Sequence, residues 1–290
     1  MPDSAAPSVL KGRDRELVLD RPRIMGILNL TPDSFYDGGR YRGLDAALRR
    51  VEQMVGEGAD LIDIGGESTR PGAPAVSVDE ELTRVVPVVE AIVRRFDIPL
   101  SIDTTKAKVA AACLAAGAHF VNDISGLTFD PEILVPVVRH RAGLFLMHTP
   151  ARPEIMQQRT AYADVCQEVI AFLREALARA RAAGVPKDHL AVDPGIGFGK
   201  DLDGNLQLLG RLDEIAGLGV PVLLGTSRKS FIGRILGLED PGDRLYGTLA
   251  TVALGVSRGV MIHRVHDVRP ARETALVAWA IERGGSGRGT

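Results

Sequence analysis

Eight short apolar runs, separated by longer stretches rich in Ala, Arg and Glu, limit the fold of this chain more than any other feature. The runs are rich in Val, Ile and Leu and show almost no alternation of hydrophobic and polar residues. Such runs are typical of strands that are buried on both faces. They occupy residues 24–30, 60–66, 98–103, 119–124, 143–148, 190–195, 220–227 and 259–267.

The intervening stretches have the features of helices, and several repeat apolar residues along one face, as in Leu173, Leu177 and Ala180. The predicted helices span 44–57, 79–95, 105–117, 131–141, 162–183, 205–217, 243–258 and 270–283. Strands that alternate with helices pair in parallel through right-handed crossovers. Eight such units in 290 residues therefore predict a single-domain α/β protein, a (β/α)8 TIM barrel. A doubly wound open sheet is the alternative, and the count of eight argues against it.

Composition and the two ends of the chain indicate the domain limits, the cellular location and the kind of partner. The barrel is expected over 21–283, with a loosely attached N-terminal extension over 1–20 and a flexible tail over 284–290. The extension lacks the apolar core of a signal peptide, and no apolar run approaches the ~20 residues of a membrane span. The net charge of −2 offers no footprint for nucleic acid. Cys113 and Cys166 indicate neither a disulfide framework nor a zinc site. We expect a soluble cytoplasmic protein with small-molecule partners.

Polar side chains gather at one end of all eight predicted strands, whereas the opposite junctions are mostly Gly, Ala, Pro and Val. In a barrel of this type the loops after the strands converge on one face, which holds the active site. Independent surface charges have no reason to collect there, so the asymmetry indicates an enzyme. The strand-end residues are Asn29, Asp63, Glu67, Thr69, Arg70, Asp103, Asn122, Asp123, Met147, His148, Asp193, Ser227, Arg228, Lys229, Ser230, Arg264, His266 and Asp267.

Taken singly, these residues have ordinary explanations. Asp103 is placed to cap a helix, His148 and His266 are compatible with surface positions, and Arg70 with an ion pair of little energetic weight. The glycine-rich segment "DPGIGFGK" from residue 193 matches neither standard phosphate-loop pattern.

Taken together, the residues form two chemical groups. One group can receive an anion such as a phosphate, and consists of Arg70, Lys229, Arg264 and His266. The other offers acceptors and donors that suit a polar heterocycle with amino and ring N–H edges, and consists of Asp103, Asn122 and Asp193.

From about Ile24 to Trp279 the sequence resembles the dihydropteroate synthase family. Eight motifs stand in the family's order at the predicted strand ends: "MGILNLTPDSFYDGG", "DIGGESTRPGA", "SIDTTK", "VNDISG", "LMH", "DPGIGFGK", "GTSRKSFIG" and "RVHDV". The resemblance implies a (β/α)8 barrel, commonly a homodimer, that joins 4-aminobenzoate to 6-hydroxymethyl-7,8-dihydropterin diphosphate and releases pyrophosphate. It also implies Mg²⁺ as a cofactor and the family's role as a sulfonamide target.

The resemblance further implies a role for each matching residue. The pterin-binding residues would be Asp103, Asn122, Ile124, Met147, Asp193, Lys229 and Arg264. The diphosphate-binding residues would be Asn29, Arg264 and His266, with Asn29 also a ligand of Mg²⁺. The aminobenzoate pocket would consist of Thr69, Arg70, Pro71, Phe198, Lys229 and Ser230. The catalytic residues would be Asp37, Asp103, Asp193, Lys229, Arg264 and His266.

Two loops are expected to close over this site. The first, 31–39, would bring Phe35 and Asp37 to the reacting centre, and the second would carry Thr69 and Arg70. Tyr36 departs from the small residue expected in the first loop, which puts loop packing and sulfonamide binding in question. An extra histidine in "MIHRVHD", His263, is interpreted as a structural barrel residue.

The implied chemistry needs no general base. An aromatic amine is a poor nucleophile, so the electrophile has to be activated. Departure of pyrophosphate would leave a methylene cation delocalised into the dihydropterin, an SN1-like route in which Asp37, Asp103 and Asp193 stabilise positive charge. Closed loops would keep water from the cation.

Two other functions remain open at this stage. A methyltetrahydrofolate-dependent methyltransferase also binds a pterin in a barrel, but it has no use for a diphosphate site, and "SRKS", "RVHD" and "ESTRPG" favour the synthase. A catalytically silent paralogue would be expected to lack catalytic positions, yet Asn29, Asp37, Arg70, Lys229 and His266 are all present.

Overall fold

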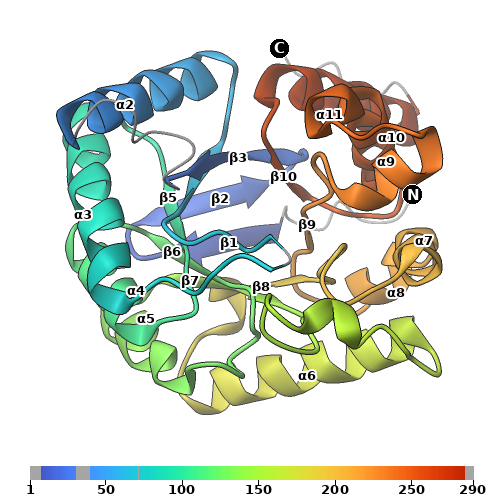
Figure 1. Cartoon of the computed structure of the whole chain (residues 1–290), viewed down its shortest axis with the longest axis horizontal. Helices are drawn as coiled ribbons and strands as arrows, with labels where there is room; N and C mark the ends of the chain where they lie inside the picture. Colours follow the sequence, from blue (N-terminus) through green and yellow to red (C-terminus); the bar gives the residue numbers. More distant parts are fainter. Residues whose placement is uncertain (1–7, 31–39, 71, 285–290) are drawn as a thin grey trace.

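The protein is described by a computed structural model that covers residues 8–30, 40–70 and 72–284. Its centre is a parallel sheet that contains eight strands within these residues, in the order β8-β7-β6-β5-β4-β3-β10-β9 (Figure 1). A bridge between Val192 and Val222 joins the two ends of this order, so the sheet is a nearly closed barrel. The strands are β3 (Arg23–Asn29), β4 (Leu61–Gly65), β5 (Leu100–Asp103), β6 (Phe120–Asp123), β7 (Gly143–Met147), β8 (Leu190–Asp193), β9 (Leu223–Leu224) and β10 (Ile262–Val265).

Helices surround the sheet (Figure 1). The predicted barrel is therefore confirmed, and an open doubly wound sheet is excluded. The α-helices are α2 (Arg40–Gly56), α3 (Val78–Arg95), α4 (Ala107–Ala115), α5 (Leu134–His140), α6 (Val165–Ala182), α7 (Leu202–Gly210), α8 (Leu212–Ala216), α9 (Ser230–Leu236), α10 (Leu245–Ser257) and α11 (Val268–Glu282). Short 3-10 turns are η1 (Pro131–Ile133), η2 (Met156–Gln158), η3 (Lys187–His189) and η4 (Pro241–Arg244).

Two helical details differ from the sequence prediction. The stretch 205–217 forms two helices, because Arg211 leaves the helical conformation between α7 and α8. Helix α9 was not predicted, since a seven-residue segment is too short to show a helical period beside the strand that precedes it.

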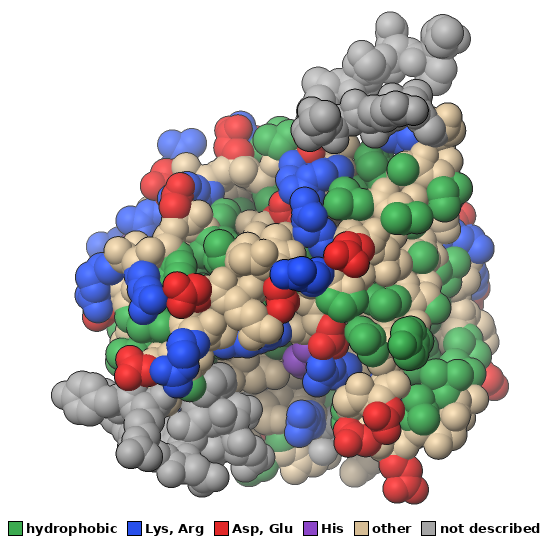
Figure 2. All heavy atoms as spheres, turned by 90° about the horizontal axis from the view of Figure 1, so that it is seen from above, with side chains coloured by type: hydrophobic (Ala, Val, Ile, Leu, Met, Phe, Trp, Pro, Cys, Tyr) green, Lys and Arg blue, Asp and Glu red, His purple; other side chains and the backbone are tan. Residues whose placement is uncertain are grey.

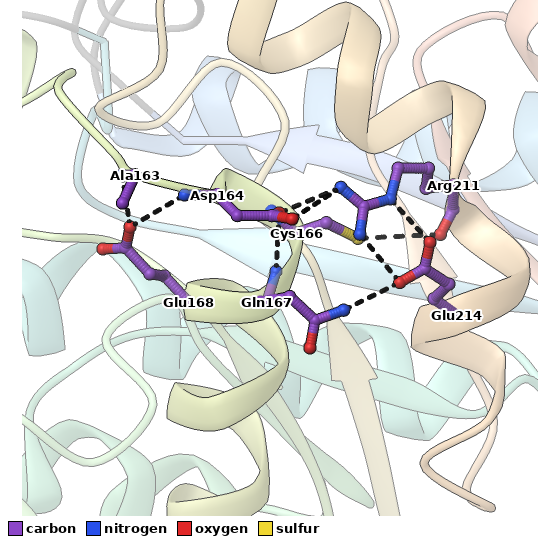
Figure 3. A network of polar contacts seen from close by, with 7 residues as sticks. All are labelled: Ala163, Asp164, Cys166, Gln167, Glu168, Arg211 and Glu214. Carbon is purple, nitrogen blue, oxygen red and sulfur yellow. Dashed lines mark hydrogen bonds and ion pairs between the residues drawn. The ribbon is translucent and has the colours of Figure 1, made fainter.

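The start of α6 is tied to the α7–α8 junction by a polar network (Figure 3). Asp164 caps the helix by accepting hydrogen bonds from the backbone N–H groups of Cys166 and Gln167 at 2.9 and 3.1 Å. The same carboxylate accepts from Arg211 at 2.9 Å, and Arg211 also donates to Glu214 at 2.6 Å. These bonds explain why α6 begins at Val165, and they hold the start of α6 to the junction between α7 and α8.

The N-terminal extension is not loosely attached over the part that the structure describes. β1 (Ser8–Gly12) and β2 (Arg15–Leu19) form an antiparallel hairpin. Leu10, Leu17 and Leu19 are buried in one cluster with Phe120 and Phe145 from the barrel strands. The earlier expectation is therefore wrong for Ser8–Leu19, whereas residues 1–7 and 285–290 lie outside the described residues. Each hairpin strand mixes polar and apolar residues, unlike the unbroken apolar runs of the barrel strands, so the sequence did not predict the hairpin. Its leucines cover the first residues of the barrel strands.

His263 is fully buried in β10, as expected of a structural residue. Burial lowers the pKa of His263 to about 4. Because the folded protein holds the neutral imidazole, this group's contribution to stability is complete above the unfolded pKa of 6.5 and is lost as pH falls towards about 4.

We expect His263→Leu to be less sensitive to acid than the natural protein. Between pH 7 and pH 5 the natural protein should lose on the order of 2 kcal/mol more unfolding free energy than the variant. Urea unfolding of both proteins at the two pH values measures this difference, and equal losses in both would contradict it.

None of the helices in the described part of the chain combines the length and the apolar character needed to cross a membrane.

Candidate active site

Arg264 lies at the centre of a polar cluster in the mouth of the barrel. From β10 its Nε donates to Asp63 Oδ2 on β4 at 2.6 Å, and its Nη2 donates to Asp103 Oδ2 on β5 at 2.8 Å. Asn122 on β6 donates from Nδ2 to the same Asp63 oxygen at 3.0 Å. Parallel strands end at one face of the barrel, and inward-facing side chains from alternate strands meet there. Four strands therefore supply one connected group of hydrogen-bonding side chains.

Two buried carboxylates in this region have perturbed acidities. Burial raises the pKa of Asp103 to about 7, although the positive charge of Arg264 opposes the rise. Burial likewise raises the pKa of Asp193 to about 6, opposed by the backbone N–H of Gly195, which donates to Asp193 Oδ1 at 2.7 Å. Desolvated carboxylates in a concave site are typical of functional positions. The bonds from Arg264 and Gly195 each use only one oxygen of the carboxyl group, so the other oxygen can accept a hydrogen bond from a ligand.

An apolar wall lies at the same end of the barrel as the polar cluster. Ile124 follows β6, Met147 ends β7, and these two residues pack with Met156 and Phe198 in one buried group. Lys229 Nζ lies 4.0 Å from the centre of the Phe198 ring, a cation–π contact. Burial and the charge of Arg264 lower the pKa of Lys229 to about 8. The site thus combines an ammonium group with flat apolar surfaces.

The loop that carries Phe198 is held from inside by a residue that the sequence analysis did not single out. Lys200 is 3% exposed, and its Nζ donates to the carbonyl oxygens of Gly195 and Phe198 at 2.9 Å each. It also lies 3.0 Å from His148 Nδ1. His148 is therefore a buried partner of the loop rather than a surface residue. A lysine at the end of a glycine-rich segment was the available signal.

Backbone geometry explains the glycines of this loop. Gly195 has a φ of +70°, and a Cβ there would lie 2.0 Å from the carbonyl oxygen of His148. No side chain fits at that distance, and L residues avoid this conformation. The glycines thus serve a tight turn beside the Asp193 carboxylate rather than a standard phosphate loop.

The loops after β9 and β10 are fastened to each other. Arg228 donates to Asp267 through Nε at 3.0 Å and Nη2 at 2.7 Å, a two-bond fork. Ser227 Oγ lies 2.9 Å from His266 Nδ1. Burial, with Arg264 and Arg228 nearby, lowers the pKa of His266 to about 3. His266 is therefore neutral near pH 7 in this structure, whereas the sequence analysis had grouped it with the cations.

The second loop begins on a buried ion cluster. Lys106 Nζ lies 2.8 Å from Glu67 Oε2 and 2.5 Å from Glu81 Oε2. Glu67 also accepts from the backbone N–H of Val76 at 2.7 Å. Beyond this anchor Thr69 is half-buried and Arg70 is exposed. The structure therefore does not bring Arg70 into the polar cluster, and Ser230, at the start of α9, is exposed as well.

Several predicted site residues lie outside the described residues. They are Phe35, Tyr36, Asp37 and the rest of the first loop, together with Pro71 in the second.

Asn29 was predicted to bind a metal ion. It ends β3, and a Cβ built on Gly65 would lie 3.8 Å from Asn29 Oδ1 and 3.7 Å from Asp103 Oδ2, so both side chains lie beside that glycine. Among the residues that the structure describes there is no group of three or more His, Cys, Asp or Glu side chains able to hold a metal by themselves. One amide oxygen suits Mg²⁺ only when substrate phosphates and water complete the ligands. The side chains present therefore fit Mg²⁺ only as part of a ligand set that phosphate oxygens and water complete.

The fold and the cluster together define a (β/α)8-barrel enzyme with its site at the C-terminal ends of the strands. Residues 25–266 match the family model described as "Pterin binding enzyme". Dihydropteroate synthase of Synechocystis sp. is 48% identical over 263 residues, which is 91% of this chain and 91% of that protein.

Solved structures agree. The Yersinia pestis dihydropteroate synthase in a sulfonamide drug complex aligns with a TM-score of 0.89 at 45% identity, covering 95% of this chain and 99% of that one. The Xanthomonas albilineans dihydropteroate synthase with 4-aminobenzoic acid aligns with a TM-score of 0.89 at 46% identity, covering 95% and 98%. The chain belongs to the dihydropteroate synthase family of pterin-binding transferases.

Proposed function

We propose that the protein condenses 4-aminobenzoate with 6-hydroxymethyl-7,8-dihydropterin diphosphate, giving 7,8-dihydropteroate and pyrophosphate. The observation that carries this proposal is the cluster of Asp63, Asp103, Asn122 and Arg264, in which four strands meet in hydrogen bonds of 2.6 to 3.0 Å. Such a set fits the donor and acceptor edges of a pterin. The aminobenzoate complex of the X. albilineans relative supports the second substrate.

The pterin ring would lie between the polar cluster and the apolar wall. Asp103, Asn122 and Asp193 would bind its edge, and Ile124 and Met147 would pack against its face. Lys229 and Arg264 would flank it, since both charges already balance the two carboxylates. The burial of these groups supports the assignment, because hydrogen bonds are more discriminating where water is excluded.

The diphosphate would lie towards Asn29, Arg264 and His266. When bound, Mg²⁺ would neutralise phosphate charge and thereby favour departure of pyrophosphate. Neutral His266 can donate one hydrogen bond from Nε2 in the tautomer whose Nδ1 accepts from the Ser227 hydroxyl. Arg264 stays charged, and Asp63 and Asp103 hold its orientation.

Chemistry at the methylene carbon would be SN1-like. Asp103 and Asp193, with Asp37 from the first loop, would stabilise the positive charge that spreads into the dihydropterin as pyrophosphate leaves. The aminobenzoate would then attack from a pocket made by Phe198, Lys229 and Ser230, under Thr69, Arg70 and Pro71 of the second loop. The cation–π pair of Lys229 and Phe198 supports this pocket, because it offers both an aromatic face and a charge for a carboxylate.

The proposal is tested by measuring pyrophosphate release from the purified protein with the pterin diphosphate and Mg²⁺, with and without 4-aminobenzoate. Release accompanied by dihydropteroate when the amine is added supports the synthase. Binding of the pterin diphosphate without turnover would favour a silent paralogue, and methyl transfer from methyltetrahydrofolate would favour the methyltransferase.

The pKa values predict a bell-shaped pH profile for kcat/KM. Asp193 and Asp103 gain their negative charges as pH rises through about 6 and about 7, so the rate rises over this range. Lys229 loses its proton as pH rises through about 8, so the rate then falls. Initial rates at limiting pterin diphosphate report these free-enzyme groups. A profile that is flat across this range would contradict the assignment.

We also propose a homodimer that forms through α9, α10 and α11. Large hydrophobic side chains are exposed on these helices, and Figure 2 shows hydrophobic side chains gathered on the side of the molecule where α10 and α11 lie. They are Ile235 at 53%, Leu236 at 51%, Tyr246 at 81%, Val277 at 62% and Ile281 at 71% exposure. Contiguous exposed apolar surface is typical of an interface.

Light scattering after size-exclusion chromatography tests the dimer. Val277→Glu combined with Tyr246→Glu should give a monomer, because two charges would have to be buried. Val135→Glu is the matched control, since Val135 is 67% exposed on α5, away from these helices. Equal masses for all three proteins would exclude this face. We further propose the cytoplasm as the location, supported by the free, buried thiols of Cys113 and Cys166.

A further inference from the structure

We propose that Asp63 is a positioning residue that sets which hydrogen-bonding groups the pterin pocket presents to its substrate. The inference rests on the pterin diphosphate being that substrate. Asp63 belongs to the hydrogen-bonded cluster, but it would act through its partners Asn122 and Arg264 rather than by touching the substrate or the reacting atoms.

The geometry places Asp63 beneath both partners. Its side chain on β4 is 0% exposed, and its Oδ2 accepts from Arg264 Nε at 2.6 Å and from Asn122 Nδ2 at 3.0 Å. Asn122 on β6 and Arg264 on β10 each lie two strands from β4 in the barrel order. The contacts therefore cross the interior instead of following neighbouring strands, and one carboxylate oxygen joins both sides of the pocket.

Asp63 determines which end of the Asn122 amide is available. An asparagine side chain has an acceptor oxygen and a donor nitrogen of similar size, and either can turn towards a ligand. An ionised carboxylate only accepts hydrogen bonds, so Asn122 has to direct Nδ2 towards Asp63. Its Oδ1 is then available as an acceptor for an N–H group of the pterin, and the pocket discriminates against an acceptor at that point.

Asp63 also orients the guanidinium of Arg264. One edge of this planar group is engaged at Nε by Asp63 and at Nη2 by Asp103. Two carboxylates that hold one plane leave the guanidinium little freedom to rotate, and Arg forks act through such fixed geometry. Arg264 is therefore pre-organised before the diphosphate arrives, which lowers the cost of binding.

A purely structural role does not account for this residue. Asp63 stands between Ile62 and Ile64 in a fully buried strand, and its Oδ1 has no hydrogen-bond partner among the described residues. A buried carboxylate with one unsatisfied oxygen destabilises the fold relative to an apolar side chain. We therefore expect the charge of Asp63 to have a function in the substrate-binding site.

Asp63 further affects the acidity of Asp103. The groups that face Asp103 are Arg264 and Lys229, which lower its pKa, and Asp63 and Glu81, which raise it. Removing the charge of Asp63 would therefore let Asp103 ionise at lower pH, and Arg264 would be freer to bind Asp103. The acid limb of the pH profile therefore reports the charge of Asp63, because loss of packing alone would not shift this limb.

The experiment compares Asp63→Ala and Asp63→Asn with the natural protein. Ser101→Ala is the matched control, because Ser101 is also fully buried, pairs with Asp63 in the strand register and has no hydrogen-bond partner for Oγ in the described residues. For each protein we would measure kcat/KM for the pterin diphosphate, KM for 4-aminobenzoate, the pH profile and the urea unfolding midpoint.

We expect Asp63→Ala to lower kcat/KM for the pterin diphosphate by about 10²-fold, since misplacement of binding groups by about 1 Å has effects of this size. KM for 4-aminobenzoate should stay nearly constant. Asp63→Asn keeps an acceptor oxygen, so it should recover part of the loss while its acid limb moves to lower pH. Ser101→Ala should match the natural protein in all kinetic measurements.

Two results would overturn the proposal: folded Asp63 variants with natural kinetics and an unmoved acid limb, or equal changes in the kinetic constants of both substrates. If Asp63→Ala does not fold, the acid limb of Asp63→Asn decides the question. Absence of turnover in the natural protein would instead refute the proposed function. That result does not depend on the Asp63 variants, so the two failures can be told apart.

Discussion

Replacing Lys229 with alanine is expected to lower kcat/KM for the pterin diphosphate by roughly 10²–10³-fold, the effect of removing one pre-organised charged donor. The Nζ group of Lys229 lies over Phe198 at 4.0 Å, and its charge lowers the pKa values of both Asp103 and Asp193. Without it, the ring loses a donor and the two carboxylates lose a compensating cation. The acid limb of the pH profile should also move to higher pH.

Steady-state kinetics of Lys229→Ala and Lys229→Met separate charge from packing, because methionine keeps most of the apolar stem. Both variants should lose activity to a similar extent if the charge dominates. Lys187→Ala, an exposed lysine on the outer surface, is the control for removal of a positive charge in general. A Lys229→Met variant with natural kcat/KM would show that the ammonium group has no part in the reaction.

Replacing Lys106 with methionine is expected to lower the free energy of unfolding by about 3 kcal/mol, because removal of one partner from a buried ion pair leaves the other charge uncompensated. Glu81 has a 0% exposed side chain, whereas Lys106 and Glu67 are 20% and 23% exposed. Water can reach part of this cluster, so we expect the lower end of the usual range. The anchor of the second loop would also loosen, and KM for 4-aminobenzoate should rise.

Urea unfolding measures the first effect directly. Lys108→Met is the matched control, since Lys108 is exposed in the first turn of α4, the helix that Lys106 precedes, and it should change stability little. Adding Glu81→Gln to Lys106→Met should restore part of the loss, because the second change removes the stranded charge. If Lys106→Met is as stable as Lys108→Met, the ion cluster does not hold the base of the second loop.

The barrel itself was predictable from local patterns. Unbroken apolar runs such as "LIDIG" and "GLFLM" indicate strands buried on both faces, and helices between them enforce parallel pairing. The N-terminal hairpin was missed because its strands mix polar and apolar residues, unlike the unbroken apolar runs of the barrel strands. Helix α9 was missed because seven residues are too few to show a helical period. Leu10 and Leu17 reveal their role only through the strand starts that they cover.

The candidate site was also predictable only in part. The sequence placed Asp103, Asn122 and Asp193 in one group and Arg264 in another at the same face, because strand ends of a parallel barrel share one face. The motif "DPGIGFGK" ends in Lys200, but it did not show that this lysine is a buried support of the Phe198 loop. The reason is that its partners are mostly backbone carbonyl groups, whose positions depend on the turn geometry.

The sequence by itself determined the strand order and the face of the barrel that carries polar chemistry, since these follow from hydrophobic periodicity and from residue types at strand ends. It also indicated the family, through the resemblance of eight motifs that stand in the family's order. Only the tertiary structure decided how those residues are paired. Asp63 meets Asn122 and Arg264 across the barrel, 59 and 201 residues away in the chain. Hydrogen bonds and pKa shifts of this kind depend on distance and burial in three dimensions, which a linear pattern does not encode.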